Sequence, residues 1–221
     1  MSATAAQQAH KSQQAQSTRQ EQKQRTREAL LDAAANLLEN QNLSSVSLRE
    51  VTRTVGIAPA AFYRHFRDMD ELGAALVDRS LNEFLPTIRK AREGQEDPDE
   101  SIRRSLDILV AYVESHQGLF RIIAREKCGG VAPVRRTIGE KLRQATDELA
   151  DDLVRLPGYA GWKCDDITML AGMFVSLMVE LASTLLDIPA DEPEQARRAI
   201  ATAHRQLHLI IVGRRHWLEE C

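Results

Sequence analysis

The sequence predicts an all-α protein in which a small N-terminal helix-turn-helix domain of three helices precedes a larger C-terminal helical domain. Ala, Leu, Arg, Glu and Gln dominate the 221 residues, whereas glycine and proline are sparse. This composition favours helix over sheet. Apolar residues recur at helical spacing along most of the chain, and no segment sustains the period of two that is typical of half-buried strands. A chain of this length can bury a core in each of two domains.

The N-terminal segment changes character at Thr18. Residues 1–18 are mainly Ala, Gln and Ser, with almost no large apolar side chains. Such a segment buries too little surface to offset the entropy cost of ordering, so we expect a flexible arm. The apolar residues that follow share one helical stripe: Leu30, Ala33, Ala34, Leu37 and Leu38. This stripe predicts the first helix of a domain over residues 19–70.

The next stretch carries the signals of two short helices joined by a tight turn. Ser47 and Glu50 form a capping box, which predicts that a helix begins at residue 48. Gly56 should end that helix, because glycine readily adopts the left-handed conformation of a sharp turn. Pro59 suits the first turn of a second helix over residues 59–65, where its missing amide would have no partner. The two helices form a helix-turn-helix.

Six further helices are expected after this motif. Asp68 and Glu71 repeat the capping signal, and their helix should run to about residue 93, followed by a linker over residues 94–100. The other five belong to a domain over residues 71–221: segments around Leu106, Ile122 and Leu142, an apolar helix over 166–187, and an amphipathic helix from 194 to about 218.

The helix-turn-helix predicts DNA binding, because a helix fits the major groove of B-DNA and its N-terminal residues meet the base edges. Phe62 and Phe66 lie four residues apart and should pack inward. Their neighbours are candidates for phosphate contacts: Tyr63, Arg64 and His65. The first residues of the second helix have no polar side chains and could touch only thymine methyl groups: Pro59, Ala60 and Ala61.

The charge needed for DNA binding must be local, since the whole chain has a formal net charge of -3. Residues 19–67 contain 8 Lys and Arg against 5 Asp and Glu, a modest surplus of positive charge. Lys23, Arg25 and Arg27 supply part of this charge near the duplex.

Residues 46–76, VSLREVTRTVGIAPAAFYRHFRDMDELGAAL, resemble the DNA-binding segment of the TetR family of bacterial transcriptional regulators. The resemblance covers residues 22–77 and rests on Gly56-Ile57, Tyr63-Arg64-His65-Phe66 and Asp70-Glu71-Leu72 at fixed spacing. It implies a bacterial cytoplasmic protein that binds a palindromic operator on double-stranded DNA. Nucleoid association then follows from operator binding.

The same resemblance assigns further residues to the DNA. It puts Arg49 there, as the candidate for a guanine contact, with Ser47 and Thr52 as phosphate or base neighbours. Many family members have a lysine at the position of Met69, where it meets a phosphate. Arg67 is the residue that could replace it.

The family resemblance implies that the C-terminal helices bind a small lipophilic effector. Within the family, this chain is similar to the repressors of unsaturated fatty-acid synthesis and desaturation, including FRIIAREKCGG at residues 120–130. That similarity implies a long-chain acyl thioester on coenzyme A or acyl carrier protein. Candidates for an acyl tunnel are Phe120, Ile123, Met173 and Phe174. Arg121 and Arg125 could meet the carrier's phosphates, or they could form an ordinary solvated face.

A homodimer is expected, because a palindromic operator needs two reading heads. The last two helices carry matching apolar stripes that suit a four-helix bundle of two chains: Leu170, Phe174, Leu177, Leu181 and Leu185 on one, and Ile200, Leu207 and Ile211 on the other. The expected mechanism is a population shift, in which the effector changes the spacing of the two heads.

Other functions have weaker support in the sequence. The alternatives are a repressor of an efflux or catabolic operon with another lipophilic effector, an acyl-CoA-handling enzyme, and a helical adaptor that binds only protein. No catalytic constellation or cofactor-binding motif is present, so we expect no enzyme activity, no catalytic residues and no cofactor.

Metal and membrane binding are also not expected. His204 and His208 have a helical metal-ligand spacing but no Glu or Cys ligand beside them, so an interface position is favoured. Three widely spaced cysteines and the absence of a signal peptide favour the cytoplasm. The apolar run over residues 167–186 includes Ser176, Glu180, Ser183 and Thr184, which indicates a buried helix rather than a membrane span.

Overall fold

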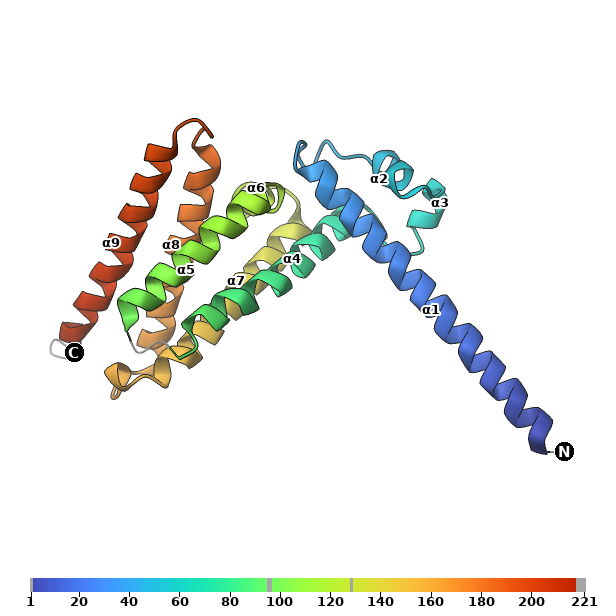
Figure 1. Cartoon of the computed structure of the whole chain (residues 1–221), viewed down its shortest axis with the longest axis horizontal. Helices are drawn as coiled ribbons and strands as arrows, with labels where there is room; N and C mark the ends of the chain where they lie inside the picture. The colour runs from blue at the N-terminus through green and yellow to red at the C-terminus, as the bar shows by residue number, and fades with distance from the viewer. Residues whose placement is uncertain (1, 95–96, 128, 218–221) are drawn as a thin grey trace. The chain divides into compact units, whose positions relative to one another are not determined.

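The computed structural model describes residues 2–94, 97–127 and 129–217, and the elements in these ranges are helices joined by turns (Figure 1). The chain divides into two compact units, Met1–Leu76 and Val77–Cys221. Helix α4, Met69–Arg92, crosses the boundary between them. The domain boundary predicted at residues 70 and 71 lies in the first turn of the same helix.

The first unit contains α1 (Ser2–Leu38), α2 (Leu48–Val55), α3 (Pro59–Phe62) and the first two turns of α4. Helix α1 packs against α2, and α2 packs against α3. The core consists of buried residues from all four helices and the turns: Leu30, Leu38, Val51, Phe62, Phe66 and Leu72. A stripe of α1 and the inward faces of the two short helices therefore build this core, as the apolar spacing predicts.

The start of α1 differs from the sequence prediction. Residues 2–18, predicted as a flexible arm, are helical in the structure. Ala and Gln are good helix formers, so a segment without an apolar stripe can still continue the helix of the domain behind it. Lack of apolar surface was therefore a poor guide to the backbone conformation of this segment.

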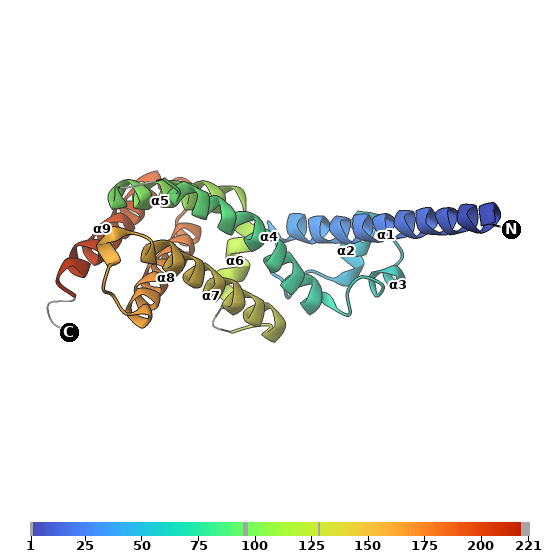
Figure 2. The ribbon, with the colours of Figure 1, turned by 90° about the horizontal axis from the view of Figure 1, so that it is seen from below.

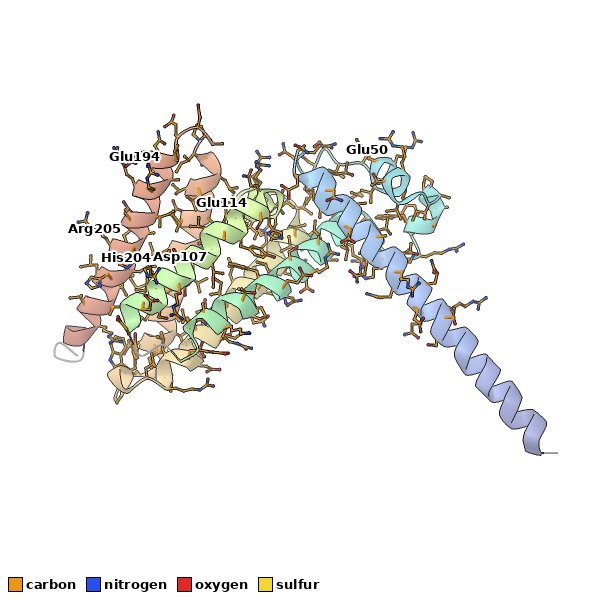
Figure 3. The ribbon with its side chains drawn as sticks, in the orientation of Figure 1. Glu50, Asp107, Glu114, Glu194, His204 and Arg205 are labelled. Atoms are coloured by element: carbon orange, nitrogen blue, oxygen red, sulfur yellow. The ribbon has the colours of Figure 1, made fainter. Side chains whose placement is uncertain are left out.

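The second unit contains α5 (Pro98–Ser115), α6 (Gln117–Glu126), α7 (Ala132–Val154), a 3-10 turn η1 (Pro157–Tyr159), α8 (Cys164–Asp187) and α9 (Pro193–Trp217), together with the rest of α4. Helix α8 packs against α5, α6, α7 and α9. Figure 2 shows the same helices from below. Helices α8 and α9 form an antiparallel pair, and Glu194 and Arg205 of α9 point outward (Figure 3).

The length and composition of α8 would allow it to cross a membrane. A core helix of a soluble protein meets the same criteria, and α8 contacts four helices of its own unit. Only 22% of the most apolar stretch of α8 is buried within this chain, so the predicted burial is partial.

Helix α4 is joined to the rest of the second unit mainly through side chains. The ring of Phe84 packs on Tyr112 of α5 at 4.5 Å between centroids and edge-on against Phe120 of α6 at 5.9 Å. Lys141 of α7 contacts Asp78 at 2.9 Å and donates to Asn82 at 2.7 Å. These contacts anchor both the middle and the start of this part of α4.

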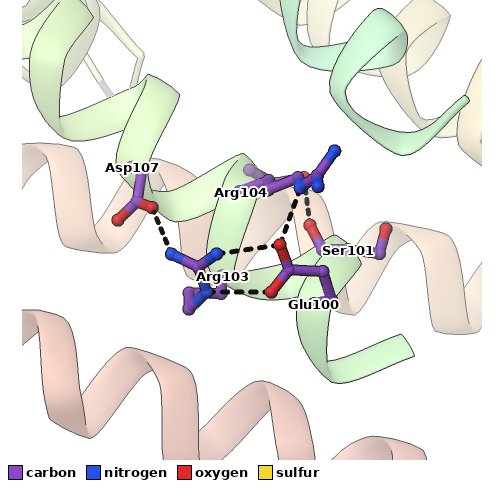
Figure 4. Close-up of polar contacts among 6 residues, drawn as sticks. Glu100, Ser101, Arg103, Arg104 and Asp107 are labelled. Carbon is purple, nitrogen blue, oxygen red and sulfur yellow. Dashed lines mark hydrogen bonds and ion pairs between the residues drawn. The ribbon is translucent and has the colours of Figure 1, made fainter. Parts of the chain in front are cut away.

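The first turns of α5 are fixed by an exposed cluster of charged residues (Figure 4). Glu100 accepts hydrogen bonds from Arg103 at 2.8 and 2.9 Å and from Arg104 at 2.7 Å. Arg103 also donates to Asp107 at 3.1 Å. Hydrogen bonds from Arg103 and then Arg104 lower the pKa of Glu100 to about 2, so this carboxylate stays charged across the physiological range.

The predicted apolar seam between subunits is wrong at four of its positions. Leu170 and Leu181 of α8 and Leu207 and Ile211 of α9 are buried within the single chain. Both helices turn an apolar face toward the core of their own unit, so these large apolar side chains are buried there. The exposed apolar residues on this helix pair are instead Met169, Met173, Leu209 and Val212.

Candidate functional site

The capping box at the start of α2 is present as the sequence predicts. The Ser47 Oγ accepts a hydrogen bond from the Glu50 amide at 3.3 Å, and the Glu50 carboxylate accepts from the Ser47 amide at 2.9 Å and hydroxyl at 2.7 Å. The bond from the Ser47 amide is the main cause that lowers the pKa of Glu50. Because its hydroxyl is engaged in the cap, Ser47 serves first to fix the start of α2.

The turn between the two short helices has the geometry that Gly56 was expected to provide. Gly56 has a φ of 76°, and its amide bonds to the carbonyl of Arg53 at 3.1 Å. The next amide, of Ile57, bonds to the carbonyl of Thr52 at 3.0 Å. Pro59 occupies the first turn of α3, which ends at Phe62 rather than at residue 65, and the chain continues as hydrogen-bonded turns to Phe66.

The aromatic cluster divides between core and surface. Phe62 and Phe66 are buried with ring centroids 5.7 Å apart, and the guanidinium of Arg27 lies 4.3 Å from the centre of the Phe66 ring. Tyr63 is 63% exposed. Its hydroxyl therefore remains free to reach a solvent-side partner, while its neighbours hold the motif against α1.

Most of the residues predicted to contact DNA lie on the exposed side of this unit. Ala61 and His65 are half-buried, and those with exposed side chains are Ser47, Arg49, Pro59, Ala60, Tyr63, Arg64 and Arg67. Thr52 is the exception, since it is only 1% exposed and its hydroxyl donates to the carbonyls of Leu48 and Arg49. The prediction that Thr52 contacts DNA is therefore wrong for this conformation. Thr52 belongs to the inward face of α2 beside Val51.

His65 lies among positive charges from two parts of the unit. Burial lowers the pKa of His65 below its ordinary value, and the nearby charges of Lys23, Arg27 and Arg64 lower it further. Its Nδ1 is buried without a hydrogen-bond partner among the described residues. The structure therefore brings Lys23 and Arg27 of α1 close to His65 of the helix-turn-helix. The sequence indicated only that these cations would lie near the DNA.

Arg67 is engaged at the start of α4. Its Nε contacts the Glu71 carboxylate at 3.0 Å, and its backbone amide donates to the same oxygen at 2.8 Å. These hydrogen bonds lower the pKa of Glu71, and Asp68 accepts from the Glu71 amide at 2.8 Å to complete the cap. A phosphate contact by Arg67 would have to compete with Glu71.

The second unit encloses a cavity of about 590 Å³ bordered by α4, α5, α6, α7, η1, α8 and α9. This volume lies within the roughly 300–1,000 Å³ that is typical of small-molecule pockets. Its wall is mainly apolar and includes Leu81, Phe84, Ile102, Leu109, Phe120 and Ile123, all of them buried. The cavity can therefore hold a lipophilic molecule away from water.

Three of the six residues predicted to contact the effector line this cavity: Phe120, Ile123 and Phe174. Met173 does not, because it is 45% exposed and lies one position off the stripe that carries Phe174 and Met178 inward. Arg121 and Arg125 lie outside the cavity wall, and Arg121 donates to Gln117 of its own helix at 2.6 Å. The solvated-face interpretation of these two arginines is thus the better one for this conformation.

The structure reveals polar wall residues that sequence spacing could not connect. Arg92, Asp152 and Arg214 line one end of the cavity together with Tyr159 and Arg155. Asp152, Arg155 and Tyr159 lie close together in the sequence, whereas Arg92 of α4 and Arg214 of α9 are distant from them. No local motif marks them, so only the fold brings them together.

A helix-turn-helix with exposed basic and aromatic residues, on the same chain as an apolar cavity, defines a DNA-binding regulator that responds to a small molecule. The family model described as bacterial regulatory proteins of the tetR family matches residues 30–76. A second, described as the tetracyclin repressor-like C-terminal domain, matches residues 98–212. The chain therefore belongs to the TetR family and is a ligand-responsive transcriptional regulator rather than an enzyme.

Solved structures share the fold over most of the chain. FadR, a fatty acid degradation regulator from Bacillus halodurans, is 14% identical, with a TM-score of 0.63 over 82% of this chain and 94% of its own. FadR from Bacillus subtilis, in complex with stearoyl-CoA, is 15% identical, with a TM-score of 0.65 over 84% and 97%. A tetR-family regulator from Streptomyces coelicolor is 16% identical, with a TM-score of 0.68 over 89% and 85%. At these identities the likeness shows the fold alone.

Proposed function

We propose that this TetR-family regulator represses genes of fatty-acid or lipid metabolism and that its effector is a long-chain acyl group, carried on coenzyme A or acyl carrier protein. The observation that carries the proposal is the mainly apolar cavity of about 590 Å³ in the second unit. A wall formed by buried leucine, isoleucine and phenylalanine suits a hydrocarbon chain better than a polar metabolite. The stearoyl-CoA bound by FadR of Bacillus subtilis is an acyl thioester bound by a protein of this fold.

The DNA contacts follow from the exposed residues of the helix-turn-helix. Arg49 is the candidate for reading a guanine, whereas Tyr63 and Arg64 bind phosphates. His65 lies beside them, and its surroundings of Lys23 and Arg27 add to the attraction for the duplex. The protein then acts in the bacterial cytoplasm, on its operator.

Helix α4 provides the path between effector and DNA. Its second half lines the cavity at Leu81, Phe84 and Leu85, and its first turn carries the cap formed by Asp68 and Glu71. A ligand that binds better to the conformation with one placement of α4 than to the conformation with another increases the population of the first. The helix-turn-helix precedes α4 directly in the chain, so the shift changes the geometry with which it meets the operator.

We infer that the regulator is a homodimer, since two helix-turn-helix units are needed to read both halves of a palindromic operator. The exposed apolar residues of α8 and α9 support a location for the interface: Met169, Met173, Leu209 and Val212. Because α8 and α9 are antiparallel, the start of one lies beside the end of the other, which gathers these four side chains at one end of the pair. Such a patch is costly to leave in water.

The proposed effector is tested by operator binding in the presence of acyl-CoA of increasing chain length. Each buried methylene contributes about 0.8 kcal/mol, so two more carbons should strengthen the effect roughly tenfold until the cavity is full. Operator affinity is measured by fluorescence anisotropy with short-chain and long-chain acyl-CoA. A response that does not change with chain length would reject an acyl effector and favour a regulator of efflux or catabolism with another ligand.

A further inference from the structure

The polar end of the cavity contains an ion pair that ties α4 to α7. Arg92, near the end of α4, donates from Nη2 to the Asp152 carboxylate of α7 at 2.9 Å. Arg155 approaches the other oxygen of Asp152 at 3.5 Å. One carboxylate is thus shared by two guanidinium groups, and both arginines line the cavity.

Arg92 retains a donor atom that no other described residue uses. The Nε of Arg92 is buried and has no hydrogen-bond partner among the described residues. Arg214 stacks its guanidinium over the Tyr159 ring, 4.6 Å from the centroid, and also lines the cavity. A buried donor without a partner is costly, and an oxygen anion of a ligand would satisfy it.

The described carboxylates that line this end do not supply the missing acceptor. Glu148 lies 4.0 Å from Arg89, and Asp152 is already engaged by Arg92 and Arg155. Glu93 also lines this end of the cavity, and its side chain is exposed. The formal charges of the lining balance, with three arginines against Glu93, Glu148 and Asp152, so an anion would be attracted by the unused donor atom of Arg92 and not by net charge.

The exposed residues of the lining belong to the same end, and we infer that the cavity opens to solvent there. Most of its lining is buried or half-buried, whereas Glu93, Gly94, Arg155 and Leu156 are exposed, and they come from the ends of α4 and α7. An acyl chain that enters here with its tail first leaves its polar end beside Arg92. The polar end of an acyl molecule that carries negative oxygen is a carboxylate or the phosphate of a carrier.

We propose that Arg92 is the receptor for an anionic head group of the acyl effector and that Asp152 is a built-in competitor, which occupies Arg92 until the ligand displaces it. The proposal rests on the acyl effector proposed above and names the residue that recognises its polar end. Displacement of Asp152 removes the ion pair that joins α4 to α7. Binding of the head group to Arg92 then releases α4 from α7 in the same step.

The test compares binding of three probes to the full-length protein by equilibrium dialysis: hexadecanoate, hexadecan-1-ol and palmitoyl-CoA. The acid or the thioester should bind roughly ten- to a hundredfold more tightly than the alcohol, the effect of a charge-assisted hydrogen bond. A preference for hexadecanoate identifies a carboxylate, and a preference confined to palmitoyl-CoA identifies the carrier's phosphates. Equal binding of all three probes overturns the anion receptor but leaves an acyl-binding regulator. Binding of none overturns the acyl effector as well.

Three variants test whether the ion pair between Arg92 and Asp152 causes the preference for the anionic probes. Arg92→Gln should abolish the preference for the anion, whereas Arg89→Gln, one turn earlier on α4 and outside the cavity wall, should leave it unchanged. Asp152→Asn keeps the receptor and removes the competitor, so it should bind the anion about tenfold more tightly and bind the alcohol as before. It should also shift operator affinity without ligand in the direction that the ligand does. An intact preference in Arg92→Gln, or weaker anion binding in folded Asp152→Asn, would overturn the proposal.

Discussion

Arg49 and Tyr63 are both exposed on the helix-turn-helix, and they differ in what they can recognise. We predict that Arg49→Ala relaxes discrimination at one base pair, with a loss of about 1–3 kcal/mol on the specific operator, because a bidentate guanine contact carries sequence information. Tyr63→Phe should instead weaken binding to all sequences, by roughly 0.5–1.5 kcal/mol, because it removes a hydrogen bond to phosphate. Anisotropy titrations on operator and random DNA separate the two effects. Equal losses on both DNAs for Arg49→Ala would exclude base reading by this residue.

His65 links the stability of the first unit to pH. Burial and the charges of Lys23, Arg27 and Arg64 lower its folded-state pKa below the ordinary value of 6.5, so the unfolded chain takes up the proton first. The contribution to stability is complete above about pH 6.5 and is lost as the pH falls through the folded-state pKa. Urea unfolding followed by circular dichroism should show that His65→Asn loses less stability than the native chain between pH 7.5 and 5.5. The same pH dependence in both proteins would contradict this assignment.

Single residues also show how far a sequence pattern predicts a site. The outward position of Tyr63 and the inward positions of Phe62 and Phe66 follow from their spacing, and the structure confirms them. Thr52 was expected beside the DNA as a neighbour of Arg49, yet a threonine can bury its hydroxyl by donating to the carbonyl four residues earlier. Met173 was placed in the cavity because it is apolar, but it lies one position away from the inward stripe.

Among the helices, those with local start and stop signals were the most predictable. The starts of α2 and α4 follow from Ser47 with Glu50 and from Asp68 with Glu71, and the end of α2 follows from Gly56. The helical conformation of residues 2–18 was not predicted, because composition indicates burial more directly than it indicates backbone conformation. The contact between Arg92 and Asp152 at the polar end of the cavity could not be predicted, since it depends on the packing of α4 against α7 and joins residues 60 positions apart.

The left-handed turn between α2 and α3 is tested by substitution of Gly56. Its φ is 76°, and an added Cβ would meet no atom within 4 Å, so the cost of a side chain is conformational and not steric. Gly56→Ala should destabilise the first unit by about 1–2 kcal/mol. Gly56→Asn should cost less, because asparagine visits this region more readily. Urea unfolding of the three proteins measures the difference, and an alanine variant as stable as the native chain would show that the turn tolerates another conformation.

At the scale of the whole molecule, the interface between two copies has to be reassigned to exposed residues. We predict that the double variant Met173→Asp with Leu209→Asp is monomeric in sedimentation velocity and binds the operator weakly, because two charges in an apolar interface are costly. Val154→Asp is the control, since Val154 is also an exposed apolar residue but lies on α7. A double variant that sediments like the native dimer would place the interface elsewhere.

We propose that a ligand inside the second unit controls the affinity of the first unit for DNA. The most direct measurement fills the cavity and leaves the helix-turn-helix untouched. Ala145 of α7 lines the cavity, and its neighbour Gln144 is exposed and does not line it, so Ala145→Phe and Gln144→Phe form a matched pair. Operator affinity is measured for both variants, checked for native helicity, with and without palmitoyl-CoA. We predict that the change in operator affinity caused by palmitoyl-CoA is at least tenfold smaller in Ala145→Phe, whereas Gln144→Phe keeps the full change. An undiminished change in operator affinity in Ala145→Phe would contradict control from this cavity, because the effector would then act from another site.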